Sequence, residues 1–326
     1  MRTVALSLLC SLAMSIDAQE PAALKLTKTI PLPGVKGRFD HFAADANGLR
    51  LFVAALGNNT LEVFDTKAAK RVKTIGKLHK PTGVLFLSEV NQIGVANGDD
   101  ASFKLFDGAS YNPVNNLGAL DDADNVRRDT KTRLIYVGYA EGALGILDPD
   151  GRKHLGDIKL PAHPESFQLE REGKRIFVNV PDAKQIAIID RDQRAVIARW
   201  PMERFRGNFP MALDESGHRL FVGCRQPPRL VVFNTETGTP VADLEISGDT
   251  DDLFYDARRN RIYLSCGEGF LDVIQHRADD RYERIAREPT RGGARTCFYS
   301  AELDLIFLAV SQRDGRDAEL RVYEPE

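Results

Sequence analysis

The chain has 326 residues, of which 43% are hydrophobic and 28% are charged, and its formal net charge is −3. This composition is typical of a globular protein that buries a core, and the length allows one large domain or two ordinary ones. No run of Lys or Arg is present, so the sequence offers no basic surface and excludes nucleic acid as an expected partner.

The N-terminal segment, residues 1–18, differs from the rest of the chain. Arg2 precedes an apolar run over residues 4–14, and Ala18 ends the segment. This pattern is typical of a secretory signal peptide that is cleaved after Ala18, and the apolar run is too short to cross a bilayer. We therefore expect a periplasmic or secreted protein without a membrane span, whose single domain covers residues 19–326.

A short motif recurs along the mature chain. Residues 45–65 and 214–234 match without a gap at an offset of 169 positions. Each of these two segments contains one of seven apolar triplets. The first residues of successive triplets lie 41 to 44 positions apart. Seven copies at one period indicate a repeat architecture. The triplets are Leu51-Phe52-Val53, Ile93-Gly94-Val95, Ile135-Tyr136-Val137, Ile176-Phe177-Val178, Leu220-Phe221-Val222, Ile262-Tyr263-Leu264 and Ile306-Phe307-Leu308.

Each repeat is predicted to form four short β-strands, of which the triplet is the second. Val, Ile, Phe and Tyr dominate these segments, and Gly, Asp, Asn and Pro separate them. A unit of this length with four strands is typical of a propeller blade, and blades must stack around an axis because a single blade cannot bury both of its faces. We therefore predict an all-β protein, a seven-bladed β-propeller with four antiparallel strands in each blade.

The two ends of the chain predict how the ring closes. The last unit ends with its third strand, at residues 319–326, and a spare strand precedes the first unit at residues 24–32. We expect the N-terminal strand to complete the last blade, because closure removes an open sheet edge. The alternative is an open β-solenoid, which the missing and spare strands disfavour.

Two repeats carry a resemblance to a known family. RIFVNVPDAKQIAIID (residues 175–190) and RLIYVGYAEGALGILD (residues 133–148) resemble the YVTN-type seven-bladed propeller repeats of exported bacterial proteins. The resemblance extends over essentially the whole mature chain. It implies the fold but no particular chemistry, because that family is functionally diverse. The Trp-Asp signature of WD40 repeats is missing, since Trp200 is followed by Pro201.

Polar side chains recur where the first strand of each unit begins. Propellers bind ligands at the axis, on the face where these loops meet, so one position in each unit is predicted to surround the axis. This ring position holds Asp40, Thr82, Asp124, Glu165, Phe209, Asp251 and Arg295. Together with adjacent positions it gives the candidate ligand-binding residues of an axial funnel: Arg38, Asp40, His41, Asp124, Asn125, His163, Glu165, Asp251, Asp252 and Arg295.

The carboxylates at the ring position predict an acidic funnel. Like charges raise one another's pKa, so such a ring favours a nearby cation, a proton or Arg295. Hard oxygen ligands suit Ca²⁺ or Mg²⁺, and no other cofactor is evident. His41 and His163 belong to units one and four, which predicts nearly opposite places and no shared metal. Alternatively, the ring is only solvated, or it serves to join neighbouring blades by hydrogen bonds.

The cysteines of the mature chain are expected to be buried free thiols. Cys224 and Cys266 occupy the same position of adjacent units, which usually lie too far apart for a disulfide. Cys266 and Cys297 lie on neighbouring blades, so a close approach of these two thiols stays the alternative. A lipoprotein anchor at Cys10 is a poor interpretation, because Leu9 stands where a small residue is expected.

The sequence favours a monomeric, non-catalytic binding platform that takes a small molecule, a peptide or a protein at the funnel. The alternative is a funnel-site enzyme such as a lactone hydrolase or a lyase, with or without a divalent cation. Asp40, His41, His163 and Glu165 would then supply an acid and a base, and Arg295 would stabilise an oxyanion. A third interpretation is an accessory subunit of a periplasmic redox enzyme, although no cofactor ligand is evident.

Overall fold

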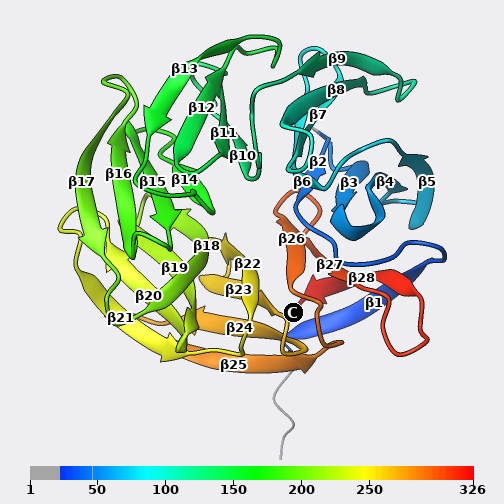
Figure 1. Ribbon diagram of the computed structural model, residues 1–326. Helices are drawn as coiled ribbons and strands as arrows, with labels where there is room; N and C mark the ends of the chain where they lie inside the picture. The colour runs from blue at the N-terminus through cyan, green and yellow to red at the C-terminus, as the bar shows by residue number, and fades with distance from the viewer. Residues whose placement is uncertain (1–22, 46) are drawn as a thin grey trace, which may run out of the picture.

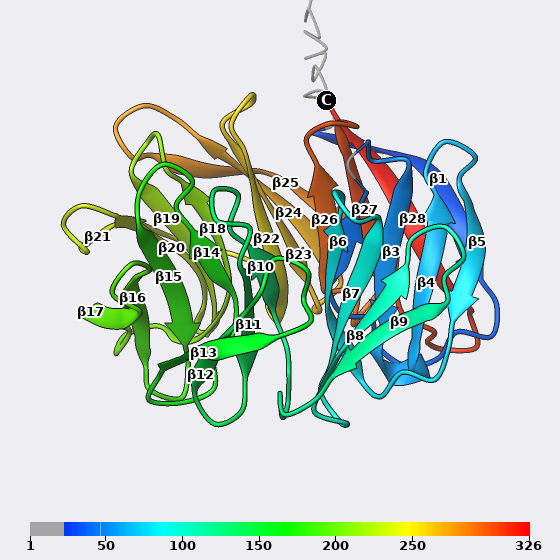
Figure 2. The same ribbon diagram turned by 90° about the horizontal axis from the view of Figure 1, so that it is seen from above.

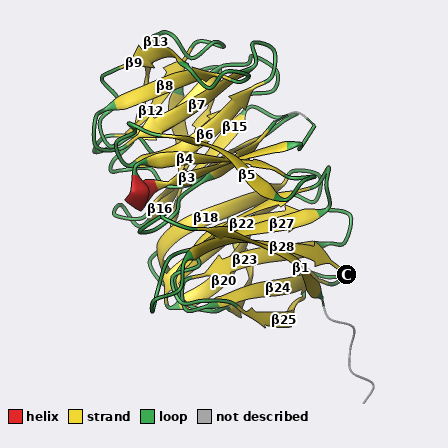
Figure 3. Cartoon of the chain, turned by 90° about the vertical axis from the view of Figure 1, so that its right-hand side faces the viewer, coloured by secondary structure: helices red, strands yellow, loops and turns green. Residues whose placement is uncertain are grey.

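The computed structural model describes residues 23–45 and 47–326. Its strands form seven sheets of four antiparallel strands around a central axis, which confirms the predicted seven-bladed propeller (Figure 1). Within these residues the only helix is η1 (Leu56–Asn58), a single 3₁₀ turn (Figure 3). No helix in this part of the chain has the length and apolar character needed to cross a bilayer. The predicted signal peptide, residues 1–18, lies outside the described residues.

The blades follow the chain order, and each of the first six consists of four consecutive strands, the first of them nearest the axis. Blade 1 consists of β2 (Phe42–Ala44), β3 (Arg50–Ala55), β4 (Thr60–Asp65) and β5 (Lys70–Ile75). Blade 2 consists of β6 (Pro81–Leu87), β7 (Gln92–Asn97), β8 (Ser102–Asp107) and β9 (Pro113–Leu117). Blade 3 consists of β10 (Val126–Arg128), β11 (Ile135–Tyr139), β12 (Ala143–Leu147) and β13 (His154–Lys159).

The second half of the ring repeats this plan, and blade 7 takes one strand from the N-terminus. Blades 4 to 7 are formed by β14 (Phe167–Leu169), β15 (Arg175–Val180), β16 (Gln185–Asp190) and β17 (Ala195–Pro201); β18 (Arg206–Asp214), β19 (Arg219–Gln226), β20 (Pro228–Asn234) and β21 (Pro240–Glu245); β22 (Thr250–Asp256), β23 (Arg261–Cys266), β24 (Phe270–His276) and β25 (Tyr282–Pro289); and β26 (Thr296–Ser300), β27 (Leu305–Val310), β28 (Ala318–Pro325) and β1 (Leu24–Leu32).

The hydrophobic core lies between neighbouring blades, because both faces of each sheet are covered. Leu51 and Val53 of β3 pack into the cluster shared with blade 7, whereas Phe52 packs into the cluster shared with blade 2. Seen from the side, the tilted sheets stand next to one another around the ring (Figure 2). Burial on both sides explains why the second strand of each repeat is a continuous apolar run and not an alternating one.

The ring closes as predicted, through the two ends of the described chain. β1 pairs with β28 in antiparallel register, from Leu24 opposite Pro325 to Leu32 opposite Ala318 (Figure 1). The backbone N–H of Glu326 donates to the carbonyl of Ala23 at 3.1 Å, which extends this pairing to the last residue. Blade 7 therefore joins segments from opposite ends of the sequence and leaves no unpaired strand between its neighbours.

On the face opposite the ring position, charged side chains connect neighbouring blades. The most buried example joins Arg191 of blade 4 to Asp129 of blade 3, with an Nη1–Oδ2 distance of 2.8 Å and side chains that are 8% and 4% exposed. Arg191 also donates to the carbonyl oxygens of Glu170 and Gly173. Further ion pairs of this kind are Arg219–Asp280 between blades 5 and 6 and Arg259–Asp304 between blades 6 and 7.

The three cysteines outside the N-terminal segment are free thiols, as predicted. Cys224, Cys266 and Cys297 are all buried. Burial raises the pKa of the Cys224 thiol to about 12, because the thiolate would lose its hydration. These residues therefore act as small apolar members of the cores between blades.

Candidate functional site

The ring position is held by the same backbone hydrogen bonds in blades 1, 3 and 4. The N–H of Asp40 donates to the carbonyl of Ala54 at 2.8 Å, and the N–H of Ala54 donates to the carbonyl of His41 at 3.1 Å. Asp124 and Glu165 make the equivalent bonds. These bonds tie the residues before the first strand to the end of the second strand. The ring side chains are therefore positioned by sheet structure and not by a free loop.

All seven residues of the ring position line one cavity of about 230 Å³ at the axis. Nine of the ten candidate residues contribute to its wall; Asp252 does not, and it lies behind His41. The candidates therefore converge on a single funnel, as the repeat register predicts. The complete lining is Arg38, Asp40, His41, Lys80, Thr82, Asp122, Asp124, Asn125, His163, Glu165, Ser166, Phe209, Arg225, Asp251 and Arg295.

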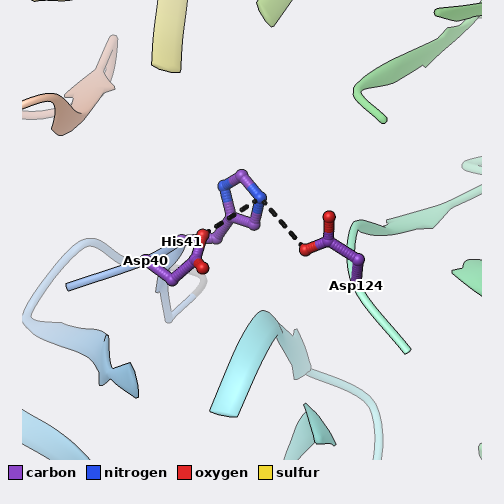
Figure 4. Close-up of side chains that lie close together, drawn as sticks. All are labelled: Asp40, His41 and Asp124. Carbon is purple, nitrogen blue, oxygen red and sulfur yellow. Dashed lines mark ion pairs between the residues drawn. The ribbon is translucent and has the colours of Figure 1, made fainter. Parts of the chain in front are cut away.

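His41 lies among three carboxylates, two of which, Asp40 and Asp124, are drawn in Figure 4. Its Nε2 atom is 3.5 Å from Asp40 Oδ1 and 3.7 Å from Asp124 Oδ1, and its Nδ1 atom is 3.6 Å from Asp252 Oδ1. Burial lowers the pKa of His41, but the charge of Asp40 and the contact with Asp252 outweigh burial and raise that pKa to about 10. Burial also raises the pKa of Asp40, to about 7. All three distances exceed the usual length of a hydrogen bond.

His163 approaches the same carboxylate from another blade. Its Nε2 atom is 4.0 Å from Asp124 Oδ2, and its Nδ1 atom lies 2.7 Å from the carbonyl oxygen of Ala140. Burial lowers the pKa of His163, but its contacts with Asp124 and Ala140 outweigh burial and raise the pKa to about 9. The sequence predicts nearly opposite places for His41 and His163 and no shared metal, and the structure brings both side chains within 4.0 Å of Asp124. The funnel is so narrow at the axis that side chains from blades 1 and 4 both reach Asp124 of blade 3.

The other side of the funnel is built around two arginines. Asp251 accepts from Arg225 and lies 3.1 Å from the Nε atom of Arg295, and Arg295 also donates to Asp249 at 2.9 Å. The guanidinium of Arg225 lies 3.9 Å from the centre of the Phe209 ring. Both arginines are therefore already paired with carboxylates, which weakens the prediction that Arg295 serves to stabilise an oxyanion.

The lining carries charges of both signs. Five carboxyl groups face four side chains of permanent positive charge and two histidines. Arg38 lies 3.4 Å from Asp40, and the Nζ atom of Lys80 lies 3.0 Å from Asp122. The funnel is thus less acidic than the ring position alone predicts.

Six lining residues were not among the candidates, although five of them share register positions with residues that were. Lys80 and Asp122 occupy the position of Arg38 and His163 in units two and three, so a search by register would have found them. Arg225 lies at the end of β19, and its stacking on Phe209 has no signal in the repeat pattern.

Close contact between blades 2 and 3 fixes the position of Asp124. A Cβ atom at Gly83 would lie only 2.2 Å from the carbonyl oxygen of Asp124, so only glycine permits this approach. The hydroxyl of Thr82 donates to the carbonyl of Ala123 at 2.7 Å. Hydrogen bonds between blades and exposure to the funnel therefore both explain polar residues in this ring.

Glu165 is distinctive within the lining. Its carboxyl group is the only one of the five without an ion pair among residues 23–45 and 47–326; the others pair with Arg38, His41, Lys80, His163, Arg225 or Arg295. Burial, followed by the negative charge of Asp124, raises the pKa of Glu165 from 4.5 to about 8. The carboxyl group of Glu165 is therefore available to a ligand and changes charge near neutral pH.

We expect Glu165→Gln to change the pH dependence of stability. A raised pKa in the folded state means that Glu165 favours folding below about pH 4.5, and that this contribution is lost as the pH rises to about 8. The variant should therefore melt at a higher temperature than the parent protein at pH 9, and this advantage should shrink or reverse at pH 5. Melting curves at both pH values measure the difference. Glu236→Gln, at an exposed site, is the control, and an equal shift at both pH values would contradict the prediction.

Comparisons with known proteins identify the fold and nothing more specific. No protein family and no curated protein matches the chain. A chain in the crystal structure of the mitotic checkpoint complex is similar to it, with a TM-score of 0.74 and 13% identity over 98% of both chains. Hydrazine synthase of Kuenenia stuttgartiensis is also similar, with a TM-score of 0.74 and 13% identity over 85% of this chain and 94% of that chain. These likenesses show the fold alone. Since 1665 chains of solved structures match, the fold selects no single function.

Proposed function

We propose that the protein is a binding protein whose axial funnel holds a small, polar organic ligand. The observation that carries this proposal is the convergence of all seven ring residues on one cavity of about 230 Å³. That volume is below the range of about 300–1,000 Å³ that is typical of sites for drug-sized ligands. A propeller suits this role because its stacked blades form a rigid platform.

The charges of the funnel indicate the chemistry of the ligand. Among the described residues no side chain forms an ion pair with the carboxyl group of Glu165, which favours a ligand with a hydroxyl or ammonium donor. Arg38 and Lys80 are 47% and 35% exposed, so their cationic groups remain accessible to an acidic group on the same ligand. Sugar acids and amino acids combine both features within a small volume.

Thermal-shift measurements with a library of sugar acids, amino acids and dicarboxylates test this function. A ligand at 100 times its Kd should stabilise the folded protein by about 2.7 kcal/mol. We expect Glu165→Gln to reduce the affinity at least tenfold, whereas the exposed control Glu236→Gln should not change it. If no compound raises the melting temperature, or if the hit binds equally well to Glu165→Gln, the funnel is not this binding site.

A second candidate, a funnel-site lactone hydrolase or lyase, is favoured by one observation. Glu165 has a pKa of about 8, close to the value that suits a general acid or base near neutral pH. We expect any such activity to fall by 10²–10⁴-fold in Glu165→Gln. Assays with aliphatic and aromatic lactones provide the measurement, and hydrolysis no faster than in buffer would remove this candidate.

We also propose that the chain is an exported, monomeric member of the YVTN-type repeat family. The support is the signal-like pattern of residues 1–18 and the resemblance of residues 133–148 and 175–190. N-terminal sequencing of the protein from its native cells should begin at Gln19. A mature protein that begins at Met1 would contradict export by this route.

A further inference from the structure

We propose that Asp40, His41 and Asp124 bind one divalent transition-metal ion, such as Zn²⁺ or Mn²⁺, at the base of the funnel. This inference rests on the proposed function, because it also takes the funnel to be a ligand site. One ligand atom from each of the three residues lies within 4.8 Å of the other two (Figure 4). The cluster joins blades 1 and 3, so the fold and not a local sequence motif brings its members together.

The distances between these ligand atoms match those of ligands that share one ion, and they are longer than direct hydrogen bonds. His41 Nε2 lies 3.5 Å from an oxygen of Asp40 and 3.7 Å from an oxygen of Asp124. Two ligands that are each 2.0–2.2 Å from one tetrahedral ion lie about 3.4 Å apart. Direct hydrogen bonds would bring the same atoms to about 2.7–3.2 Å.

The other side of the imidazole faces a carboxylate that can orient the ring. His41 Nδ1 faces Asp252 Oδ1 at 3.6 Å, which directs Nε2 toward Asp40 and Asp124. Asp252 is held in turn, because its Oδ2 atom accepts the backbone N–H of Cys297 at 2.9 Å. Histidine ligands almost always donate their second ring nitrogen to such a partner, which fixes the tautomer and the ring orientation.

Asn125 provides an independent observation. It lines the same cavity and is only 2% exposed, yet its Oδ1 atom has no hydrogen-bond partner among residues 23–45 and 47–326. A buried amide oxygen without a partner costs about 1–3 kcal/mol. This buried oxygen without a partner indicates that the cavity wall beside Asp124 is built to receive a ligand.

The ligand set decides the class of metal. Ca²⁺ takes six to eight oxygen ligands, whereas this cluster offers one imidazole nitrogen and two carboxylates. Imidazole nitrogen suits first-row transition metals. The structure therefore favours these ions over the Ca²⁺ or Mg²⁺ that the carboxylates alone suggest.

Calorimetric titration of the full, chelator-treated chain with ZnCl₂ and with MnCl₂ tests the site. We expect one equivalent of either ion to bind, and Asp124→Asn to weaken binding by more than 100-fold. Asp252→Asn should weaken it by about 10–100-fold, as expected for a partner that orients a ligand. The matched control is Asp121→Asn, which makes the same charge change at an exposed site of the same loop and should leave the affinity unchanged.

Three results would overturn the inference: neither ion binds with unit stoichiometry, Asp124→Asn binds as tightly as the parent protein, or Ca²⁺ or Mg²⁺ binds more tightly than both ions. Circular dichroism of the metal-free variants checks that each is folded. Because the titration uses the metal alone, its failure leaves organic-ligand binding at Glu165 in place. Conversely, failure of the ligand library in the metal-free protein leaves the metal result in place.

Discussion

Deletion of residues 23–32 should leave the chain unable to fold cooperatively. Residues 24–32 form β1, whose Leu24, Ile30 and Leu32 are buried in the last blade. At about 1.5–3 kcal/mol for each aliphatic side chain, their loss removes roughly 5–9 kcal/mol, which is comparable to the whole stability of a typical domain. The deletion also exposes the edge of β28 to pairing with other chains. Circular dichroism melting and size-exclusion chromatography should show no cooperative transition and soluble aggregates.

A rearranged chain distinguishes the effect of losing β1 from the effect of shortening the chain. Because the N–H of Glu326 bonds to the carbonyl of Ala23, a short Gly-rich linker can join Glu326 to a transplanted copy of residues 23–32. We expect this chain to regain a cooperative melt, whereas a scrambled copy of the segment should not restore it. A deletion variant that melts within a few degrees of the parent protein would show that closure by β1 is dispensable.

Arg191→Met should destabilise the protein by about 3–5 kcal/mol, because it leaves the buried carboxylate of Asp129 without its cationic partner. The side chains of the pair are 8% and 4% exposed, so water cannot replace the lost interaction. Two backbone N–H groups, from Lys131 and Thr132, still donate to Asp129 but carry no charge. Urea denaturation at neutral pH measures the change in the free energy of unfolding.

A nearby surface pair provides the control. Lys174 and Asp192 form an ion pair, but their side chains are 68% and 65% exposed. Lys174→Ala should therefore leave the free energy of unfolding almost unchanged. The double variant Arg191→Met with Asp129→Asn should recover part of the loss, since no unpaired charge remains. Equal effects of Arg191→Met and Lys174→Ala would refute the argument from burial.

The fold could be predicted because the residues that recur in each repeat are those that the fold requires at these positions. The triplet at Leu51 is apolar at every position because alternate side chains of β3 enter two different cores. Closure was also predictable, because the strand missing from the last unit matches the spare strand at residues 24–32. Residues 1–18 lie outside the described residues, so the signal peptide stays a prediction.

The position of a residue within its repeat, its register, predicted only part of the site. Register identifies which positions face the axis, and it placed Asp40, Asp124 and Glu165 on one cavity. Register does not show how far a side chain extends. It therefore predicted nearly opposite places for His41 and His163, although both side chains reach Asp124. Pairings between side chains depend on distances across the axis, which a linear pattern does not contain.

Closure of the ring also sets an order of events during synthesis. The hydroxyl of Thr27 donates to the carbonyl of Val322, a partner 295 positions later in the chain. At about 5–20 residues per second, the ribosome delivers that partner roughly 15–60 s after the N-terminal strand has emerged. The nascent chain therefore carries an unpaired β-strand for nearly the whole of translation, and only a chain translated almost to its last residue can complete the fold.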